Sequence, residues 1–158
     1  MKKQLDAVAR FHEAFLQKNA KWPQHLTIEE YELRHRLMQE ENDEYLEACD
    51  ERDIVGVADA LGDQLYILCG TILKHGLQHI IEDVFDEIQS SNMSKLCDTE
   101  EDAKATVVWY QEQIAAGKCP YNDPIYTYNS EIGKFIVKDG KTGKVLKNIK
   151  YKKVEWKD

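Results

Sequence analysis

Two long segments that read as amphipathic helices, each with an acidic stripe, constrain the fold most strongly. The first, 27–49, contains Glu40-Glu41-Asn42-Asp43-Glu44, and the second, 54–74, contains Asp59-Ala60-Leu61-Gly62-Asp63. Residues three or four apart share one face of a helix, so the three glutamates lie together and so do the two terminal aspartates of the second run. Only a short polar turn separates the two segments, which predicts that the helices pack antiparallel.

Two facing carboxylate stripes would form a set of hard oxygen ligands, which Mg²⁺ and Mn²⁺ prefer. A solvated acidic face is the alternative, because charged residues make up 32% of the chain. Asp63 favours the metal site, since it lies in the largely apolar run 57–69, which we expect in the core. A carboxylate buried there needs a cation or hydrogen bonds. The sequence therefore predicts a metal site between the two helices.

The spacing of apolar residues predicts three more helices, at 3–17, 78–90 and 99–116. Two β-prone runs, 133–138 and 144–147, flank a glycine-containing turn and predict a hairpin. We therefore expect an all-α fold, a helical bundle of about five helices with a small C-terminal β-hairpin.

Local signals mark the ends of the acidic helices. Thr27 followed by Glu30 is a capping-box pattern at the start of the first. Gly76, directly after His75, is typical of the residue that ends a helix.

A length of 158 residues predicts a single domain, 1–158, with a helical core at 1–96 and an extension at 97–158. The net charge of −8 argues against nucleic acid as a partner. No apolar run reaches membrane-spanning or secretory-signal length, and the four cysteines form no Cys-x-x-Cys pair. These features predict a cytoplasmic protein with no membrane partner.

The order Glu-Glu-x-x-Glu and then Asp-Ala-Leu-Gly-Asp resembles the all-α nucleoside triphosphate pyrophosphohydrolase superfamily. The likeness is greatest to its MazG-like, phosphoribosyl-ATP-pyrophosphohydrolase-like branch, and it implies a four-helix-bundle assembly. It extends to Phe11-His12-x-Ala14-Phe15, Arg34-x-Arg36-Leu37, Ser91-Asn92-Met93-Ser94-Lys95-Leu96, Gly143-Lys144-Val145-Leu146-Lys147 and Tyr151.

This resemblance implies that Glu40, Glu41, Glu44 and Asp63 ligate Mg²⁺, with Mn²⁺ as a substitute. One glutamate would instead take the proton from the attacking water, and we choose Glu41 over Glu40. Many relatives carry an acid three residues before the ligand aspartate, where this chain has Ala60. Asp59, four residues before, is either a substitute ligand or a residue behind the ligands that orients a basic side chain.

Contacts to the nucleotide substrate are also implied by the resemblance, although polar surface positions are the alternative for each. The residues concerned are Asn92, Lys95, Arg36, Lys144, Lys147 and Tyr151.

The implied activity is Mg²⁺-dependent hydrolysis of a nucleoside triphosphate or related nucleotide to the monophosphate and pyrophosphate, as house-cleaning of the nucleotide pool. Hydrolysis of phosphoribosyl-ATP in histidine biosynthesis is a second possibility. A non-catalytic helical oligomerisation or regulatory module is the alternative from another class. Members of the look-alike family are dimers or tetramers, so a homodimer or homotetramer is expected.

Overall fold

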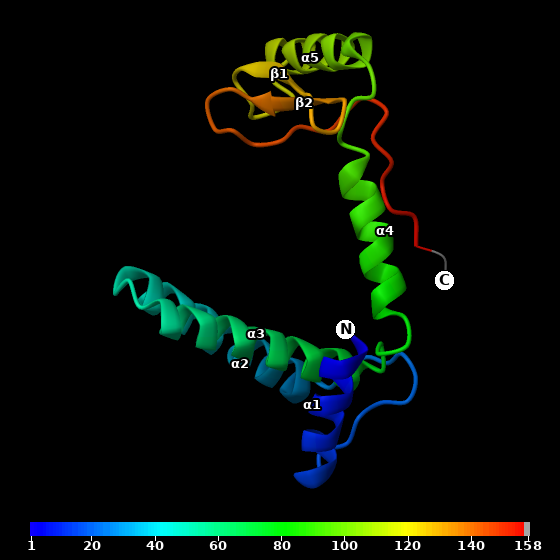
Figure 1. The fold of residues 1–158 in the computed structure, drawn as a ribbon. Coiled ribbons are helices and arrows are strands. Elements are labelled where there is room, and N and C mark those ends of the chain that lie inside the picture. The colour runs from blue at the N-terminus through cyan, green and yellow to red at the C-terminus, as the bar shows by residue number, and fades with distance from the viewer. Residues whose placement is uncertain (157–158) are drawn as a thin grey trace. The chain divides into compact units, whose positions relative to one another are not determined.

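The computed structural model describes residues 1–156, which form five α-helices and one two-stranded antiparallel sheet (Figure 1). The predicted all-α fold with a small hairpin is therefore confirmed. The chain divides into two compact units, Met1–Asp83 and Val84–Asp158, called here the N-terminal and the C-terminal unit. The assignment of the whole chain to one domain stays a prediction. Within residues 1–156, no helix combines the length and the apolar character needed to cross a membrane.

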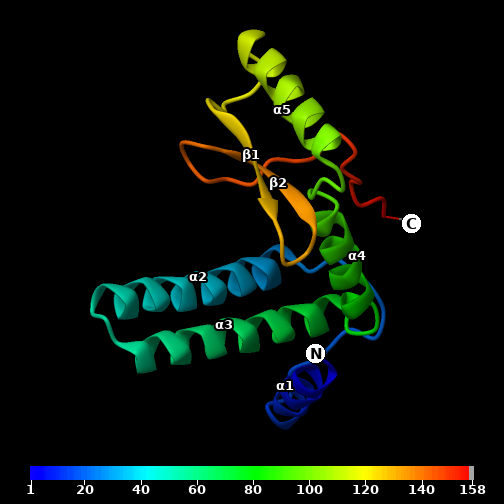
Figure 2. The same cartoon turned by 45° about the horizontal axis from the view of Figure 1, so that its top comes forward.

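The N-terminal unit is built around an antiparallel pair of long helices, α2 (Ile28–Asp50) and α3 (Ile54–His75) (Figure 2). The capping box is present as predicted, because the Thr27 hydroxyl accepts from the Glu30 amide and the Glu30 carboxylate accepts from the Thr27 amide. Asp53 caps α3 by accepting from the Val55 amide at 3.0 Å. Only three residues separate the helices, so they pack side by side as predicted.

The loop between α1 (Lys2–Ala14) and α2 closes the carboxyl end of α3. The Ala20 amide donates to the Leu73 carbonyl, and the Gln24 amide donates to the His75 carbonyl, each at 3.0 Å. Gly76 ends the helix with a φ of +72°. A Cβ atom there would lie 2.1 Å from the Trp22 carbonyl oxygen, so the left-handed turn and the close backbone both require glycine.

The core of this unit lies at the carboxyl-terminal part of α3, where Leu5 and Val8 of α1 pack against Cys69, Ile72 and Leu73. Nearer to its amino-terminal end, α3 has large apolar side chains that are exposed to solvent. Leu61, Leu65 and Leu68 are 50%, 41% and 43% exposed. The prediction that the whole run 57–69 is core was wrong for the single chain, because α3 is apolar around most of its circumference and α1 covers only its last turns.

Helix α4 (Ile81–Met93) begins three residues later than predicted, in the N-terminal unit, and ends in the C-terminal unit. The reason is a turn at residues 77–80, in which the Ile80 and Ile81 amides both donate to the Leu77 carbonyl.

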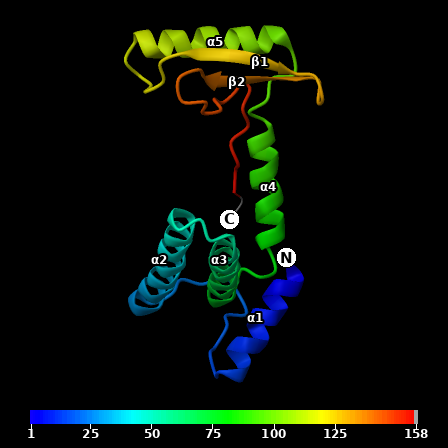
Figure 3. The same cartoon turned by 60° about the vertical axis from the view of Figure 1, so that its left-hand side comes forward.

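In the C-terminal unit, α5 (Glu100–Ala115) packs along the hairpin of β1 (Pro124–Asn129) and β2 (Lys134–Asp139) (Figure 3). Thr99 caps α5 by accepting from the Asp102 amide. The small core between helix and sheet contains Cys97, Ala103, Tyr110, Val137 and Leu146.

The hairpin exists, and its second strand β2 matches the predicted run 133–138, but the other strand was predicted in the wrong place. Its first strand is β1, and the turn lies at residues 130–133, with Gly133 at a φ of +65°. The expected partner run, 144–147, forms only one bridge, between Lys138 and Val145, and two flanking backbone hydrogen bonds. The run Ile125-Tyr126-Thr127-Tyr128 is strongly β-prone, although it lies between proline and asparagine residues, which are typical of turns.

Asp139 ties three segments of the C-terminal unit together. Its buried carboxylate accepts from the Thr142 hydroxyl at 2.7 Å and from the Asp123 and Asn122 amides at 3.0 and 3.4 Å. The Thr142 hydroxyl, and after it these backbone amides, hold the pKa of Asp139 below its ordinary value.

The stability of the C-terminal unit should therefore depend on pH. A lowered folded-state pKa contributes stability above the ordinary Asp pKa of about 3.9, and this contribution is lost as the pH falls through the folded value. Asp139→Asn should be less stable than wild type at pH 7, and the difference should shrink at acid pH. Urea unfolding at pH 7 and at pH 3, followed by near-ultraviolet circular dichroism, measures it. An equal difference at both pH values would contradict this role.

Candidate active site

Glu41 lies where α2 faces α3. The Gln64 side-chain amide of α3 donates to the Glu41 carbonyl at 3.3 Å and to the Asn42 side chain at 3.4 Å, which holds the two helices together at this level. The Glu41 side chain is half-buried. Its Oε2 atom is inaccessible to solvent and has no hydrogen-bond partner. Sequence reasoning missed Gln64, although a polar residue within an apolar helical run was the available signal.

Carboxylates surround Glu41. Burial, and then the charges of Asp63, Glu44, Glu40 and Asp59, raise the pKa of Glu41 above its ordinary value. The structure therefore brings all five predicted acidic residues into one electrostatic cluster.

These side chains do not converge into a closed ligand shell. In the described part of the chain, no three carboxylate, imidazole or thiol groups lie close enough to hold an ion. Like charges repel, and Glu40, Glu44, Asp59 and Asp63 are all exposed and free to turn away from one another. The ligand set inferred from the sequence stays a prediction.

The expected burial of Asp63 was wrong for the single chain. Asp63 is exposed, and Gly62 beside it has no atom within 4 Å of the position a Cβ would take. The neighbouring apolar side chains lack a partner on this face of α3. Asp63 nevertheless lies close enough to Glu41 for its charge to raise the pKa of Glu41.

A shallow acidic hollow of about 270 Å³ lies toward the turn between α2 and α3. Glu44 and Asp59, one from each helix, line it together with Glu47 and Asp53. The carboxylate cluster therefore reaches the surface.

Arg34, two helical turns before Glu41 on the same stripe of α2, is a clamp between the helices. Its Nε donates to the Thr71 hydroxyl at 2.9 Å, and its guanidinium donates to the Ile67 carbonyl at 2.6 Å. Partial burial lowers its pKa, and it forms no ion pair within residues 1–156. Gly70 provides the space for the Arg34 side chain, because a Cβ at that position would lie 2.6 Å from the guanidinium.

Arg36 lies elsewhere. It is exposed and lines a hollow of about 330 Å³ with Tyr31, Glu32 and His35. At 100° per residue it points away from the stripe of Arg34 and Glu41. Its predicted contact with substrate stays a prediction.

The remaining predicted substrate residues belong to the C-terminal unit, where they form two small groups. The Lys95 ammonium donates to the Asn92 side chain at 2.8 Å. Tyr151 shares a hydrogen bond of 2.9 Å with Ser91, and the Lys147 ammonium lies 4.6 Å from the Tyr151 ring centroid. Lys144 lies apart from these, 5.4 Å from the ring of Tyr121. Contacts of these residues with substrate stay predictions.

Comparison with known proteins identifies the chain. Residues 8–92, more than half of it, match the model of the family described as phosphoribosyl-ATP pyrophosphohydrolase. The protein is thus an all-α nucleotide pyrophosphohydrolase, a hydrolase that acts on phosphoric anhydrides. It belongs to the phosphoribosyl-ATP pyrophosphohydrolase family, within the MazG-like superfamily predicted from the sequence. No curated protein and no solved structure matches it.

Enzymes of this family generally use divalent metals, and the residues present fit such an ion. The donors are all hard carboxylate oxygens, Glu41 Oε2 is buried without a partner, and four like charges raise the pKa of Glu41. A divalent cation would both partner this oxygen and offset the repulsion.

Removing one charge should reveal the repulsion among the clustered carboxylates. In EDTA, Glu41→Gln should raise the melting temperature by a few degrees, because relief of carboxylate repulsion stabilises the helix pair by about 0.5–1 kcal/mol. Added Mg²⁺ should stabilise wild type more than Glu41→Gln. Thermal melting followed by circular dichroism measures both effects.

Asp43→Asn is the matched control, because Asp43 belongs to the same acidic run but is exposed and hydrogen-bonded to Gln39. It should respond to Mg²⁺ as wild type does. Equal melting shifts for all three proteins would contradict a metal site at Glu41.

Proposed function

We propose that this enzyme hydrolyses a nucleoside triphosphate or related nucleotide, in a Mg²⁺-dependent reaction, to the nucleoside monophosphate and pyrophosphate. The observation that carries the proposal is the buried, unpartnered Oε2 of Glu41 among four other carboxylates on two antiparallel helices. The resemblance in sequence suggests that the enzyme clears surplus or noncanonical nucleotides.

Glu40, Glu41, Glu44 and Asp63 would hold the cation, with Asp59 as a further ligand or as a residue that orients a basic side chain. When bound, the cation would neutralise phosphate charge and lower the pKa of the attacking water. One glutamate would instead accept the proton of that water, and we choose Glu41, the half-buried glutamate where α2 faces α3. Arg34 and Gln64 hydrogen-bond α2 to α3, and this register is what would let carboxylates from both helices reach one cation.

Asn92, Lys95, Arg36, Lys144, Lys147 and Tyr151 are proposed contacts to the substrate. Lysine and arginine would balance phosphate charge, and the Asn92 amide would hydrogen-bond to a phosphate oxygen. The cation–π contact of Lys147 with Tyr151 gives one of these groups a defined place.

Phosphoribosyl-ATP is the second candidate substrate, and the description of the matching family favours it. One assay decides between the candidates. Pyrophosphate release should be measured on canonical, deoxy and modified triphosphates and on phosphoribosyl-ATP, with and without Mg²⁺. Orthophosphate as the sole product would refute the proposed bond specificity.

Asp63→Asn should lower turnover by at least about 100-fold on the best substrate, because metal-held charge stabilisation is worth several kcal/mol and each 1.36 kcal/mol is a factor of ten. Because the Asp63 side chain is exposed, Asp63→Asn should leave the fold intact. Steady-state pyrophosphate release with Asp43→Asn as control measures the effect. Wild-type turnover in Asp63→Asn would refute the two-helix site.

We also propose that the chain forms a homodimer or homotetramer through α2 and α3. Apolar side chains on both helices are left without cover in the single chain: Leu46, Ile54, Val55, Leu61, Leu65 and Leu68. Contiguous exposed apolar surface of this kind marks a protein–protein interface.

Size-exclusion chromatography with light scattering should give a dimer or tetramer mass at micromolar concentration. Leu61→Glu combined with Leu68→Glu should lower that mass, because it buries two charges in the interface. Ile132→Glu is the control, an equally exposed position in the hairpin turn of the C-terminal unit. A strict monomer for wild type would count against the assembly.

A further inference from the structure

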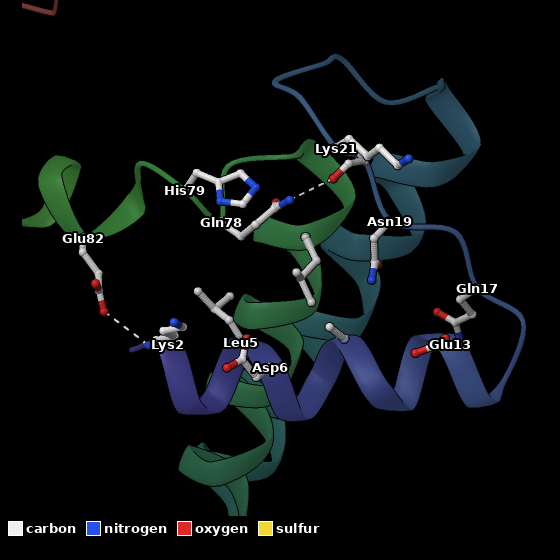
Figure 4. Close-up of a pocket in the computed structure, with 13 residues that line it drawn as sticks. Lys2, Leu5, Asp6, Glu13, Gln17, Asn19, Lys21, Gln78, His79 and Glu82 are labelled. Carbon is white, nitrogen blue, oxygen red and sulfur yellow. Dashed lines mark hydrogen bonds between the residues drawn. The ribbon is translucent and has the colours of Figure 1, made fainter.

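The largest hollow of the N-terminal unit has little apolar surface to cover. It measures about 890 Å³ and lies between α1, the loop that follows it, the carboxyl end of α3 and residues 78–82 (Figure 4). Most of its lining is charged or polar, and its large apolar residues, Leu5 and Leu73, are already buried in the core. A partner in this hollow would therefore gain little from apolar contact.

The C-terminal unit has a hollow of another kind, of about 610 Å³, beside α5. One side of it consists of four residues of α5: Ala105, Val108, Trp109 and Glu112. Residues at this spacing share one face of a helix, and the buried residues of α5 lie on the other face. Val108 and Trp109 are 51% and 44% exposed, so this α5 stripe is an apolar surface without cover in the single chain.

The other side of the hollow is the segment 147–149, which runs along α5 in the opposite direction. The Tyr110 hydroxyl accepts from the Lys147 amide at 3.0 Å and donates to the Lys147 carbonyl at 3.1 Å. One turn earlier on α5, the Thr106 hydroxyl accepts from the Ile149 amide at 3.3 Å. The side chain of Ile149 is 46% exposed in the hollow. These hydrogen bonds fix the level of each residue of the segment along α5.

The two sides of the hollow match in chemistry at each level. Near Lys147 the α5 stripe carries Glu112, and near Ile149 it carries Ala105 and Val108. Within residues 1–156, neither Glu112 nor Lys147 forms an ion pair, with each other or with another side chain. Two opposite charges and two apolar surfaces therefore line one hollow without satisfying each other.

We propose that a second copy of this chain covers the hollow with the same surface, about a two-fold axis parallel to α5. Such an axis keeps each level along the helix and exchanges the two sides, so the α5 stripe of one protomer lies on the segment 147–149 of its partner. Glu112 then faces the partner's Lys147, and Val108 faces the partner's Ile149. The surface is self-complementary in charge and in apolar character, and its centre holds Trp109, a residue type enriched in interface hot spots.

This contact is additional to the proposed assembly through α2 and α3. Helix α5 and the segment 147–149 lie outside residues 8–92, which match the family. One helix face and one short segment bury less surface than a standard protein interface, so we expect a weak association. Lys147 is also a proposed substrate contact, so the readout of the test is the mass of the assembly and not the activity.

The test is sedimentation velocity of the whole chain carrying Leu61→Glu and Leu68→Glu, which removes association through α2 and α3. The concentration series reaches hundreds of micromolar, where a weak contact is populated. This parent should form a dimer. Glu112→Lys should weaken the dimer at least about tenfold, because it places like charges opposite each other in both halves of the contact. Adding Lys147→Glu should restore the dimer, since exchanging the two charges forms both pairs again.

Glu131→Lys is the matched control, because it makes the same change of charge at an exposed position in the hairpin turn, outside the hollow. It should leave the dimer unchanged. Val108→Lys should abolish the dimer by placing a charge in the contact, whereas Val145→Lys, at a similarly exposed valine outside the hollow, should keep it. Circular dichroism checks that each variant is folded.

A parent that stays monomeric at every concentration would overturn the proposal. A dimer that Glu112→Lys leaves unchanged, or that the exchange of both charges does not restore, would overturn it as well. Pyrophosphate release by wild type is measured separately from these masses. Failure of the α5 contact is therefore distinguishable from failure of the proposed function.

Discussion

The register between α2 and α3 is the constraint on which the rest of the N-terminal unit depends. Three contacts along the pair agree on it: Arg34 with Thr71, Glu41 with Gln64, and Ala48 with Gly56. At the last of these, a Cβ on Gly56 would lie 3.1 Å from that of Ala48. A slip of one helical turn would break all three contacts and separate the glutamates of α2 from the aspartates of α3.

This helix pair carries two unfavourable features that a single chain leaves in place. Like charges crowd around Glu41, and large apolar side chains of α3 remain in water. Both features lower the stability of the chain by itself. The proposed cation would offset the first, and the proposed assembly would cover the second. Structural features that are costly in isolation and useful in a complex are expected where function is located.

Local signals in the sequence predicted most of the helical architecture. Thr27 and Gly76 act at the ends of helices through the residues next to them in the chain, so a short sequence window contains most of the signal. The partner strand of the hairpin was wrongly predicted because β-pairing depends on which segment offers the better partner. Residues 124–129 form the ladder on one edge of β2, and 144–147 forms only a single bridge on the opposite edge. The predicted burial of Asp63 was wrong for a related reason. An apolar run does not reveal whether the protein surface that covers it belongs to the same chain.

The sequence also predicted part of the candidate site. Helical periodicity put the acidic residues of each helix on one stripe, and the short turn between the helices brought Glu41 and Asp63 into one electrostatic cluster. The contact of Gln64 with Glu41 was not predicted, since it depends on tertiary packing between residues 23 positions apart in the sequence.

The loop between α1 and α2 has a consequence of its own. Ala20 and Gln24 supply the amides that the last carbonyls of α3 lack, so these loop residues complete the helix. Their amide protons should exchange with solvent at rates closer to those of a helix than of a connector. For the same reason, the stretch from Ala20 to Gln24 has a fixed length despite its irregular backbone, and insertions would be tolerated only nearer to Thr27. In this chain a segment without regular secondary structure determines where its longest apolar helix ends.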